Sequence, residues 1–267
     1  MKNKVVVITG ASSGIGRSLA YEFASRGCKL VLAARRVELL NQIKAQLNQA
    51  EILVQQTDVS MESDCSQLIR KAVDHFGRID ILINNAGISM RAIFEDVDLD
   101  VIRRLMDVNF WGTVYCTKYA LPYLLRTKGS VVGIISIAGF VGLPGRTGYS
   151  ASKFAIRGFL DALRIENLKR GLHVLVAAPG FTASEVRKAA LTASGSKQGE
   201  TPRKEEKMMT ADECARHIAN AVQKRKRQLI LTFTEGKLSV FLGKFLPKLL
   251  DKLTFNYMSK EADSPFK

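Results

Sequence analysis

A tyrosine and a lysine four residues apart are the side chains of this sequence best suited to proton transfer. Tyr149 and Lys153 belong to the stretch Tyr-Ser-Ala-Ser-Lys, and on a helix this spacing places both side chains on one face. A nearby cation stabilises a phenolate and lowers the pKa of the phenol from about 10, which suits a tyrosine to donate and accept protons near neutrality. The same spacing also occurs in ordinary surface pairs, so the interpretation needs support from other residues.

Two further polar residues give that support. Ser136 ends an apolar run thirteen residues before Tyr149, where its hydroxyl is placed to polarise a carbonyl group. Asn109 lies inside a helical pattern although asparagine is a poor helix former, which indicates a buried polar role. Together with Lys153, these residues predict a catalytic site for proton transfer.

A glycine-rich turn lies between the first expected strand and the first expected helix. Residues 9–16 read Thr-Gly-Ala-Ser-Ser-Gly-Ile-Gly, which is the spacing G-x-x-x-G-x-G. Glycines allow a tight turn and a close approach of the backbone to a pyrophosphate, which then lies against the helix N-terminus. The turn therefore predicts a dinucleotide site. Its expected contacts are Gly10, Ser12, Ser13, Gly14, Ile15 and Gly16.

The end of the second expected strand indicates which dinucleotide binds. It carries Arg35 and Arg36, where an acidic residue would contact the ribose hydroxyl and repel a 2′-phosphate. Arginine does the reverse, so the cofactor is predicted to be NADP(H). The alternative is that both arginines are solvated charges at the start of a helix. Asp58 and Val59, after the third strand, are placed to meet the adenine.

Short apolar runs alternate with longer helical patterns along most of the chain. This alternation is typical of a parallel sheet covered on both faces, so we expect one doubly wound, Rossmann-type α/β domain over residues 1–235, with about seven strands. The expected strands are Val5–Ile8, Lys29–Ala33, Ile52–Gln56, Ile79–Ile83, Ser130–Ser136, His173–Ala178 and Gln228–Thr232. The expected helices are Ile15–Ser25, Val37–Gln49, Ser63–Phe76, Leu99–Arg126, Tyr149–Arg170 and one that begins near Thr210.

These motifs, in their order and spacing, resemble the short-chain dehydrogenase/reductase family. The resemblance covers residues 4–232 and adds two motifs, Asn-Asn-Ala-Gly over residues 84–87 and Pro179-Gly180. It implies that Asn85, Ala86 and Gly87 line the cofactor cleft. It also implies that Pro179, Gly180 and Thr182 close on the nicotinamide carboxamide.

The same resemblance implies a role for each residue of the catalytic group. Tyr149 would donate a proton to a ketone oxygen or take one from an alcohol, and Lys153 would bind the nicotinamide ribose and lower the pKa of Tyr149. Ser136 would orient the substrate oxygen, and Asn109 would hold a water that connects Lys153 to solvent. No metal is expected, because the three histidines are scattered and offer no ligand set.

The substrate side is less well defined by the sequence. Four mainly apolar positions, Ile88, Phe140, Leu143 and Val186, are candidates by position and favour a hydrophobic carbonyl or alcohol. Residues 192–207 lack apolar periodicity, so we expect a mobile loop on this side. The family commonly forms dimers and tetramers through the helices that hold Asn109 and Tyr149, so the resemblance implies a homo-oligomer.

Composition limits the remaining possibilities. The formal net charge is +15, from 40 Lys plus Arg against 25 Asp plus Glu. A basic run at residues 224–227 has no interleaved aromatic residues, so nucleic-acid binding is not expected. The apolar stretches are too short or too interrupted for a signal peptide or a spanning helix, which predicts a cytoplasmic protein.

The last segment, residues 236–267, forms a basic amphipathic extension. Lysines lie beside a row of leucine and phenylalanine side chains on a helical wheel, and Pro247 should interrupt the helix. Such a row needs a cover, since it would otherwise be an exposed apolar patch. Its own domain or a partner subunit is the favoured cover, and peripheral membrane contact through residues 236–260 is the alternative.

The sequence thus predicts an NADP(H)-dependent carbonyl reductase or alcohol dehydrogenase. A second hypothesis is a reductase of 3-oxoacyl groups held on a carrier protein or as a thioester, which the positive charge favours. A third, from another class, is a cofactor-binding regulatory protein without turnover. The complete set of Asn109, Ser136, Tyr149 and Lys153 argues against the third hypothesis.

Overall fold

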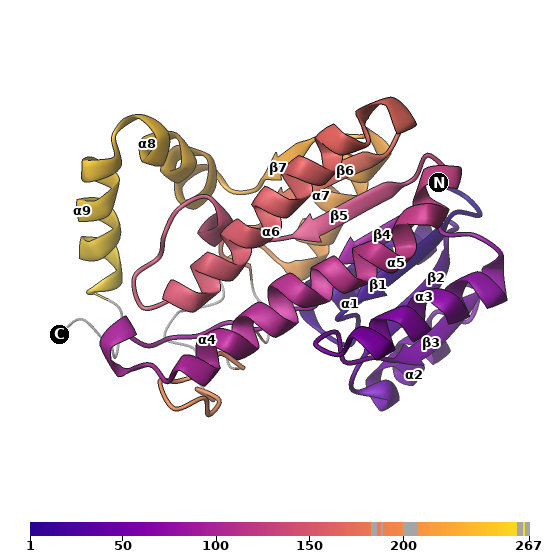
Figure 1. The fold of residues 1–267 in the computed structure, drawn as a ribbon, viewed down its shortest axis with the longest axis horizontal. Helices are drawn as coiled ribbons and strands as arrows, with labels where there is room; N and C mark the ends of the chain where they lie inside the picture. Colours follow the sequence, from indigo (N-terminus) through magenta and orange to yellow (C-terminus); the bar gives the residue numbers. More distant parts are fainter. Residues whose placement is uncertain (183–185, 188, 200–207, 261–263, 265–267) are drawn as a thin grey trace.

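The centre of the molecule is a seven-stranded sheet in which all neighbouring strands are parallel (Figure 1). The computed structural model describes residues 1–182, 186–187, 189–199, 208–260 and 264. The strand order is β3-β2-β1-β4-β5-β6-β7, which confirms the doubly wound α/β prediction. The strands are β1 (Val5–Thr9), β2 (Lys29–Ala34), β3 (Ile52–Gln56), β4 (Ile81–Asn84), β5 (Ser130–Ile134), β6 (His173–Ala178) and β7 (Gln228–Ile230).

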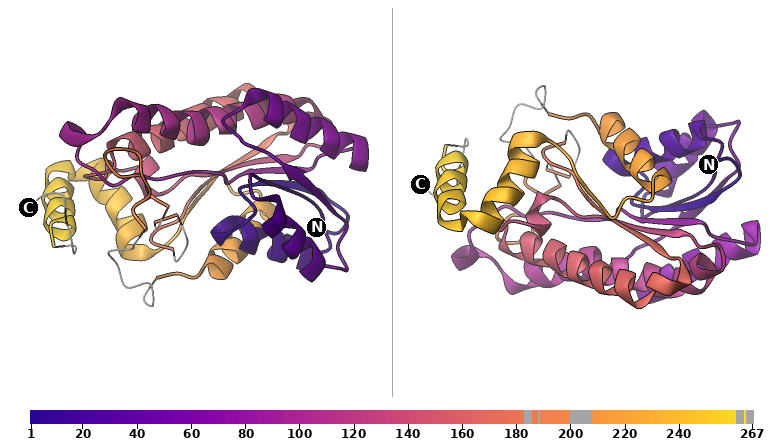
Figure 2. Two further views of the ribbon diagram at one scale, coloured as in Figure 1. Left: turned by 90° about the horizontal axis from the view of Figure 1, so that it is seen from below. Right: turned by 90° about the horizontal axis from the view of Figure 1, so that it is seen from above.

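Helices cover both faces of this sheet (Figure 2). One core packs α1, α2 and α7 against the sheet around residues such as Phe23 and Ile218. The other core packs α3, α5 and α6 around residues such as Leu124 and Leu160. The helices of the domain are α1 (Gly14–Ser25), α2 (Val37–Gln46), α3 (Glu62–Phe76), α4 (Leu99–Leu105), α5 (Gly112–Arg126), α6 (Thr147–Glu166) and α7 (Ala211–Gln223).

The order of the sheet determines where a ligand can bind. The strand β1 pairs with β2 on one side and with β4 on the other. From β1 to β3 the strands are added toward one edge of the sheet, and from β4 onward they are added toward the other edge. In open parallel sheets, ligands bind beyond the carboxyl ends of the strands at such a switch point. The glycine turn that follows β1 lies at this point.

The helix expected over Leu99–Arg126 is not uniform. A π-helical turn, Met106–Trp111, separates α4 from α5. Asn109 is buried within this turn, and Gly112 follows it against Val59, where an added Cβ would lie 2.8 Å from the valine side chain. The wider turn thus brings a polar side chain inward at a place where sequence periodicity alone predicts a regular helix.

Several element ends also differ from the sequence prediction, and three of them lie close to the site or follow it on α6. The strand β5 ends at Ile134, because Ser136 instead caps a short 3-10 helix, Ile137–Gly139, by accepting the N–H of Ala138. The helix α6 begins two residues before Tyr149, at Thr147. Its C-terminal end gives way after Glu166 to a separate 3-10 turn, Leu168–Arg170.

The chain after β7 forms a small helical unit at one end of the molecule (Figure 1). A π-helical turn, Phe233–Leu238, leads into α8 (Ser239–Phe245) and α9 (Pro247–Met258). The interruption that the sequence predicts at Pro247 is confirmed, since this residue opens α9. Within the part of the chain that the structure describes, no helix is long and apolar enough to span a bilayer.

Candidate active site

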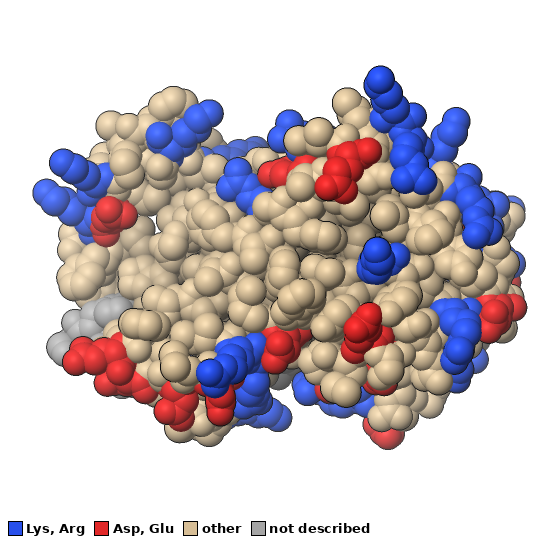
Figure 3. All heavy atoms as spheres, in the orientation of Figure 1, with Lys and Arg blue, Asp and Glu red and all other residues tan. Residues whose placement is uncertain are grey.

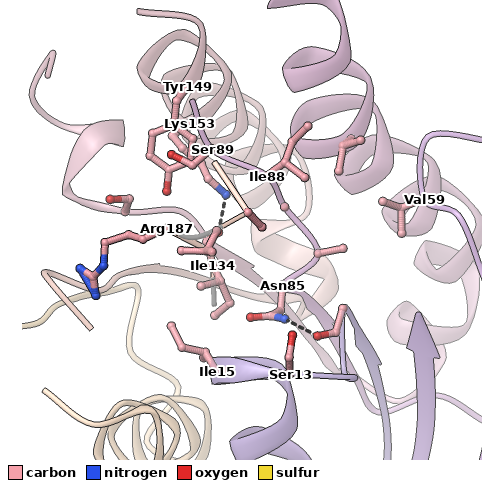
Figure 4. A pocket seen from close by; sticks show the side chains of 18 of the residues that line it. Ser13, Ile15, Val59, Asn85, Ile88, Ser89, Ile134, Tyr149, Lys153 and Arg187 are labelled. Atoms are coloured by element: carbon pink, nitrogen blue, oxygen red, sulfur yellow. Dashed lines mark hydrogen bonds between the residues drawn. The ribbon is translucent and has the colours of Figure 1, made fainter. Parts of the chain in front are cut away.

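A cavity of about 1000 Å³ lies beyond the carboxyl ends of the strands. Its lining contains almost all of the site residues predicted from the sequence (Figure 4). These are Gly10, Ser12, Ser13, Gly14, Ile15, Arg35, Arg36, Asp58, Val59, Asn85, Ala86, Gly87, Ser136, Tyr149, Lys153, Pro179, Gly180 and Thr182. Gly16 and Asn109 are not part of the lining. They contact residues next to the lining or within it, as described below.

The glycine turn is shaped by close backbone approaches. Gly10 adopts a φ of +65°, and a Cβ there would lie 2.8 Å from the Cα of Ala86. A Cβ on Gly16 would lie 2.2 Å from the carbonyl oxygen of Gly10, so only glycine fits where helix α1 meets the turn. Thr9 ties the turn to the next motif, because its hydroxyl accepts the N–H groups of Asn85 (3.0 Å) and Ala86 (3.1 Å).

The N-terminus of α1 is open toward the cavity. Ser13 occupies the N-cap position in extended backbone conformation, and its side chain makes no capping hydrogen bond. The first N–H groups of a helix have no partner within the helix, and the helix dipole favours an anion there. This end of the cavity is therefore built to accept a phosphate group.

Arg35 and Arg36 lie at the same end. Both are exposed and line the cavity. The guanidinium of Arg36 donates to the hydroxyls of Ser12 (3.1 Å) and Ser13 (3.0 Å), which places its charge beside the glycine turn. Asp58 holds the neighbouring loop, because its carboxylate accepts the N–H (3.1 Å) and the hydroxyl (2.7 Å) of Ser60.

The predicted catalytic residues gather at the other end of the cavity. Tyr149 and Lys153 both lie on α6, and the Nζ of Lys153 is 5.7 Å from the centre of the tyrosine ring. Lys153 is 4% exposed and donates to the carbonyl oxygen of Ile134 at 3.0 Å (Figure 4). Ser136 lines the same part of the cavity, and its hydroxyl acts to lower the pKa of the Tyr149 phenol. The structure thus brings three of the four predicted catalytic side chains to one place.

The titration behaviour of this pair differs from the sequence-based expectation. Burial raises the pKa of the Tyr149 phenol, while the hydrogen bond with Ser136 and the positive charge of Arg146 act in the opposite direction. Burial also lowers the pKa of Lys153 to about 8. The expected lowering of the Tyr149 pKa is therefore wrong for this structure, because desolvation disfavours the charged form of both side chains.

Asn109 connects the π-helical turn to the active-site helix. Its amide accepts the N–H of Ile88 (2.8 Å), and its Nδ2 donates to the carbonyl of Ile88 (3.0 Å) and to the hydroxyl of Ser152 (2.9 Å). Ser152 in turn donates to the carbonyl oxygen of Tyr149 at 2.7 Å. The amide of Asn109 therefore positions α6 and the segment after Gly87, and the expected role in holding a water stays a prediction.

The substrate side matches the sequence prediction only in part. Ile88, Leu143 and Val186 line the cavity, whereas Phe140 does not. Phe140 instead packs beneath a guanidinium, with the Cζ of Arg157 at 4.0 Å from its ring centre. The prediction that Phe140 contacts the substrate is therefore not supported by the cavity lining, because its ring packs against Arg157 of α6.

Several cationic side chains on this side were missed by sequence reasoning. Arg104, Arg146, Arg187 and Lys197 all line the cavity, in addition to Lys153. Arg146 donates to the hydroxyl of Ser89 at 2.8 Å, and Arg187 is buried and donates to the carbonyl of Thr182. Figure 4 shows Arg187 among the side chains that line the cavity. For Arg146 the sequence does contain a signal, because a residue three positions before Tyr149 lies close to the catalytic tyrosine at the start of the same helix.

The loop expected over residues 192–207 is described only as far as residue 199. Its first part returns on itself, since Thr192 N–H donates to Ser196 and Gln198 N–H donates to Ala190. Arg104 donates to the carbonyl of Gly195 at 3.2 Å, which attaches this part to α4. Residues 200–207 lie outside the described part of the chain, so the predicted mobility stays a prediction.

Comparison with known proteins identifies the class to which this fold and site belong. Residues 4–194 match the family model for short chain dehydrogenases. The chain therefore belongs to the short-chain dehydrogenase/reductase family, whose members are NAD(P)(H)-dependent oxidoreductases acting on CH–OH groups.

Individual relatives show how far the similarity extends. A "Dehydrogenase/reductase SDR family protein 7-like" from Dictyostelium discoideum is 36% identical over 270 residues, with 98% of this chain and 84% of the relative covered. An "11-beta-hydroxysteroid dehydrogenase A" from Arachis hypogaea is 43% identical over 189 residues, which cover 69% of this chain and 54% of that protein. An alcohol dehydrogenase from the archaeon Thermococcus sibiricus, solved in complex with 5-hydroxy-NADP, has a TM-score of 0.75 at 27% identity, covering 85% of this chain and 94% of the other.

Proposed function

We propose that this protein is an NADP(H)-dependent carbonyl reductase or alcohol dehydrogenase for a hydrophobic carbonyl or alcohol substrate. One observation carries the proposal. Tyr149, Ser136 and Lys153 line one end of a cavity, and the glycine turn with Arg35 lines the other end. A nicotinamide dinucleotide has its reactive ring at one end and its adenosine at the other, which matches this division.

The residues present fit such a cofactor. The cradle at Gly10 and Gly16 has no room for a side chain, and the cavity volume lies at the upper end of the range for small-molecule sites. Arg35 and Arg36 supply positive charge where a ribose 2′-phosphate would lie, and no acidic side chain occupies that strand end. The archaeal alcohol dehydrogenase crystallised with an NADP analogue supports the same choice.

When bound, the cofactor donates or accepts a hydride at its nicotinamide ring. For carbonyl reduction, Tyr149 supplies the proton to the substrate oxygen, and its raised pKa keeps the phenol protonated at neutral pH. Ser136, which lines the cavity together with Tyr149, holds the substrate oxygen beside the phenol. Lys153, with a pKa of about 8, is mostly charged at pH 7 and stabilises the phenolate that remains after proton donation.

The substrate class follows from the other side of the cavity. Ile88, Leu143 and Val186 offer apolar contacts for the body of a hydrophobic molecule. The relative from Arachis hypogaea is named for a hydroxysteroid, which has this character. We therefore infer a bulky, largely apolar ketone or secondary alcohol as the substrate.

A second candidate is favoured by the cations near the cavity. Arg104 and Lys197 add positive charge to the lining, and the whole chain carries a net charge of +15. These charges suit a 3-oxoacyl thioester or an acidic carrier protein. A regulatory protein without turnover would have no need for Ser136, Tyr149 and Lys153 in the lining of one cavity.

One assay separates these candidates. Purified protein is mixed with NADPH, and the loss of nicotinamide absorbance is followed with steroid ketones, smaller cyclic ketones and a 3-oxoacyl thioester. We expect the bulky apolar ketones to be reduced with the highest kcat/KM. A clear preference for the thioester would select the second candidate, and NADPH binding without turnover on any substrate would indicate the regulatory protein.

We also propose a homo-oligomer formed through α5 and α6. Trp111, next to α5, and Phe154, on α6, remain 43% and 42% exposed in the single chain. Trp111 stacks on Tyr115, so a pre-formed aromatic surface is available for a second copy. Sedimentation equilibrium should give a multiple of the chain mass, and Phe154→Glu should reduce it. A monomer at all concentrations would contradict this proposal.

A further inference from the structure

The two C-terminal helices carry an apolar surface that the described part of the chain leaves largely exposed. Figures 1 and 2 show α8 and α9 projecting at one end of the molecule, away from the sheet. Only Leu250 and Met258 of α9 are buried, and no residue of α8 is. The exposed fraction is between 45% and 58% for five large side chains: Phe241, Phe245, Leu246, Leu249 and Leu253.

These side chains are arranged in rows. Phe241 and Phe245 lie one turn apart on α8 with their ring centres 4.8 Å apart, and Leu249 and Leu253 lie one turn apart on α9. From the sequence, the rest of the domain or a partner subunit is expected to cover these side chains. Contacts with the described part of the domain do not cover them. Contiguous apolar patches on folded proteins usually mark an interaction site.

The charges beside the rows indicate what covers them. Residues 236–260 contain five lysines, all exposed, and Asp251 is their single acidic residue. On α9, Lys248 and Lys252 each precede a leucine of the row, so the cations flank the apolar side chains. Figure 3 shows basic side chains beside an uncharged surface at this end of the molecule.

This combination favours lipid over a second copy of the chain. Two copies joined through the same face would bring their lysines together, and like charges in contact oppose association. A bilayer with anionic headgroups accepts both features, because leucine and phenylalanine enter the acyl boundary while lysines remain among the phosphates. We propose that α8 and α9 form a docking surface for an anionic lipid bilayer.

The surface is structurally connected to the substrate side of the cavity. An added Cβ on Gly243 of α8 would lie 3.5 Å from the side chain of Val141, so the helix packs closely on this loop. Leu143, two residues further, lines the cavity. Docking would therefore place the substrate loop next to the bilayer in which an apolar substrate dissolves.

The test measures binding of the full-length chain to sedimented vesicles. Neutral phosphatidylcholine vesicles are compared with vesicles that also contain phosphatidylglycerol, at low and at high salt. We expect binding to the anionic vesicles and its loss at high salt, because screening weakens the lysine contacts. The assay uses no substrate and no turnover, so its failure would be distinct from failure of the proposed enzymatic function.

Two double variants address the two features of the surface. Lys248→Glu with Lys252→Glu should weaken binding at least about 25-fold, since each lysine contributes roughly fivefold near an anionic surface. Its matched control is Lys224→Glu with Lys226→Glu, which removes the same charge from the most concentrated basic run of the chain. The control should bind almost as well as the unmodified protein.

The apolar variant is Leu249→Ser with Leu253→Ser. Its control is Ile165→Ser with Leu168→Ser, because these side chains are even more exposed, at 68% and 72%, but lie in the last turn of α6 and in the 3-10 turn that follows it. Only the first pair should reduce vesicle binding. Retained circular dichroism and NADPH binding would show that each variant is folded.

A gain-of-signal measurement avoids dependence on loss of binding. Leu253→Trp in a Trp111→Phe background places a single tryptophan on α9. Its emission should shift to shorter wavelength on addition of anionic vesicles. Equal binding of the charge variant and its control, an unshifted emission, or variants that change only the oligomer mass would overturn the proposal.

Discussion

The two ends of the active-site cavity are built in different ways. The cofactor end is formed by short turns, namely the glycine turn after β1 and the segments that follow β2, β3 and β4. The substrate end is formed by side chains on longer segments, which include Leu143, Arg146, Arg187 and Leu191. Backbone geometry and glycine constrain the first end, whereas side-chain identity decides the second. This difference separates what makes the protein an oxidoreductase of its family from what selects its substrate.

The largest effect should come from a change at the junction of the two ends. Tyr149→Phe removes the proton donor but keeps the ring, so kcat should fall by about 100- to 10,000-fold, the usual range for general acid–base catalysis. The affinity for NADPH, measured by fluorescence titration, should change less than threefold because the cofactor end is intact. A variant that retains most of its turnover would remove Tyr149 from the proposed role.

A change at the adenosine end of the cofactor site should alter cofactor affinity and leave kcat nearly unchanged. Arg35→Asp replaces a cation beside the expected 2′-phosphate by an anion, and a charge-assisted contact contributes about 1.5–3 kcal/mol. The ratio of the Kd values for NADH and NADPH should therefore fall by roughly 10- to 100-fold. The kcat at saturating cofactor should stay nearly constant. An unmodified protein that binds both cofactors equally would contradict the assignment of Arg35.

Lys153 makes the stability of the fold depend on pH. Its pKa is about 8 in the folded protein against 10.5 as the reference value, so the unfolded state binds more protons between these pH values. The contribution of Lys153 to the free energy of unfolding is thus unfavourable below pH 8 and disappears as pH rises toward 10.5. The full penalty is about 3 kcal/mol, and the hydrogen bond to Ile134 offsets roughly 1 kcal/mol of it.

Lys153→Met is the variant that tests this. At pH 7 the variant should be more stable than the unmodified protein by about 2 kcal/mol in urea titrations, with turnover lost. The difference should shrink as pH rises above 8. A variant that is less stable at pH 7 would contradict this prediction. It would show that the interactions of the Lys153 ammonium outweigh the cost of burying its charge.

The smallest expected effect concerns the support behind the site. Ser152→Ala removes the acceptor of the buried Asn109 amide and the donor to the carbonyl of Tyr149. The unfolding free energy should fall by about 1–2 kcal/mol, because a buried donor loses its partner. The kcat should fall a few-fold with little change in NADPH affinity. Thr147→Ala, at an exposed position of the same helix, is the control, and its turnover should be unaffected.

The cofactor end was predictable because its physics is local. The spacing of the glycines and the arginines after β2 follow from short-range needs of a turn and a phosphate. The structure places Gly10, Gly14, Arg35 and Arg36 in one cavity lining. The alternation of apolar runs likewise predicts the seven strands and their parallel sheet. Gly16 and Asn109 support the lining without being part of it. Sequence position alone does not distinguish such a supporting residue from one that contacts the cofactor.

The remainder could not be predicted because it depends on long-range contacts. The π-helical turn around Asn109 forms where that side chain reaches Ile88 and Ser152, from two other segments. Phe140 packs under Arg157, a contact that sequence position does not indicate. The pKa of Tyr149 depends on burial, which spacing to Lys153 does not reveal.

The most direct test of the central claim follows the hydride itself. The protein is incubated with a bulky apolar ketone and NADPH that carries deuterium at the reactive carbon of the nicotinamide, on either face in separate reactions. The account predicts an alcohol with one deuterium on the carbinol carbon from only one of the two labelled cofactors. Tyr149→Phe should form at most about one hundredth as much product in the same time. An alcohol free of deuterium from both, or equal product from the variant, would contradict direct transfer at this site.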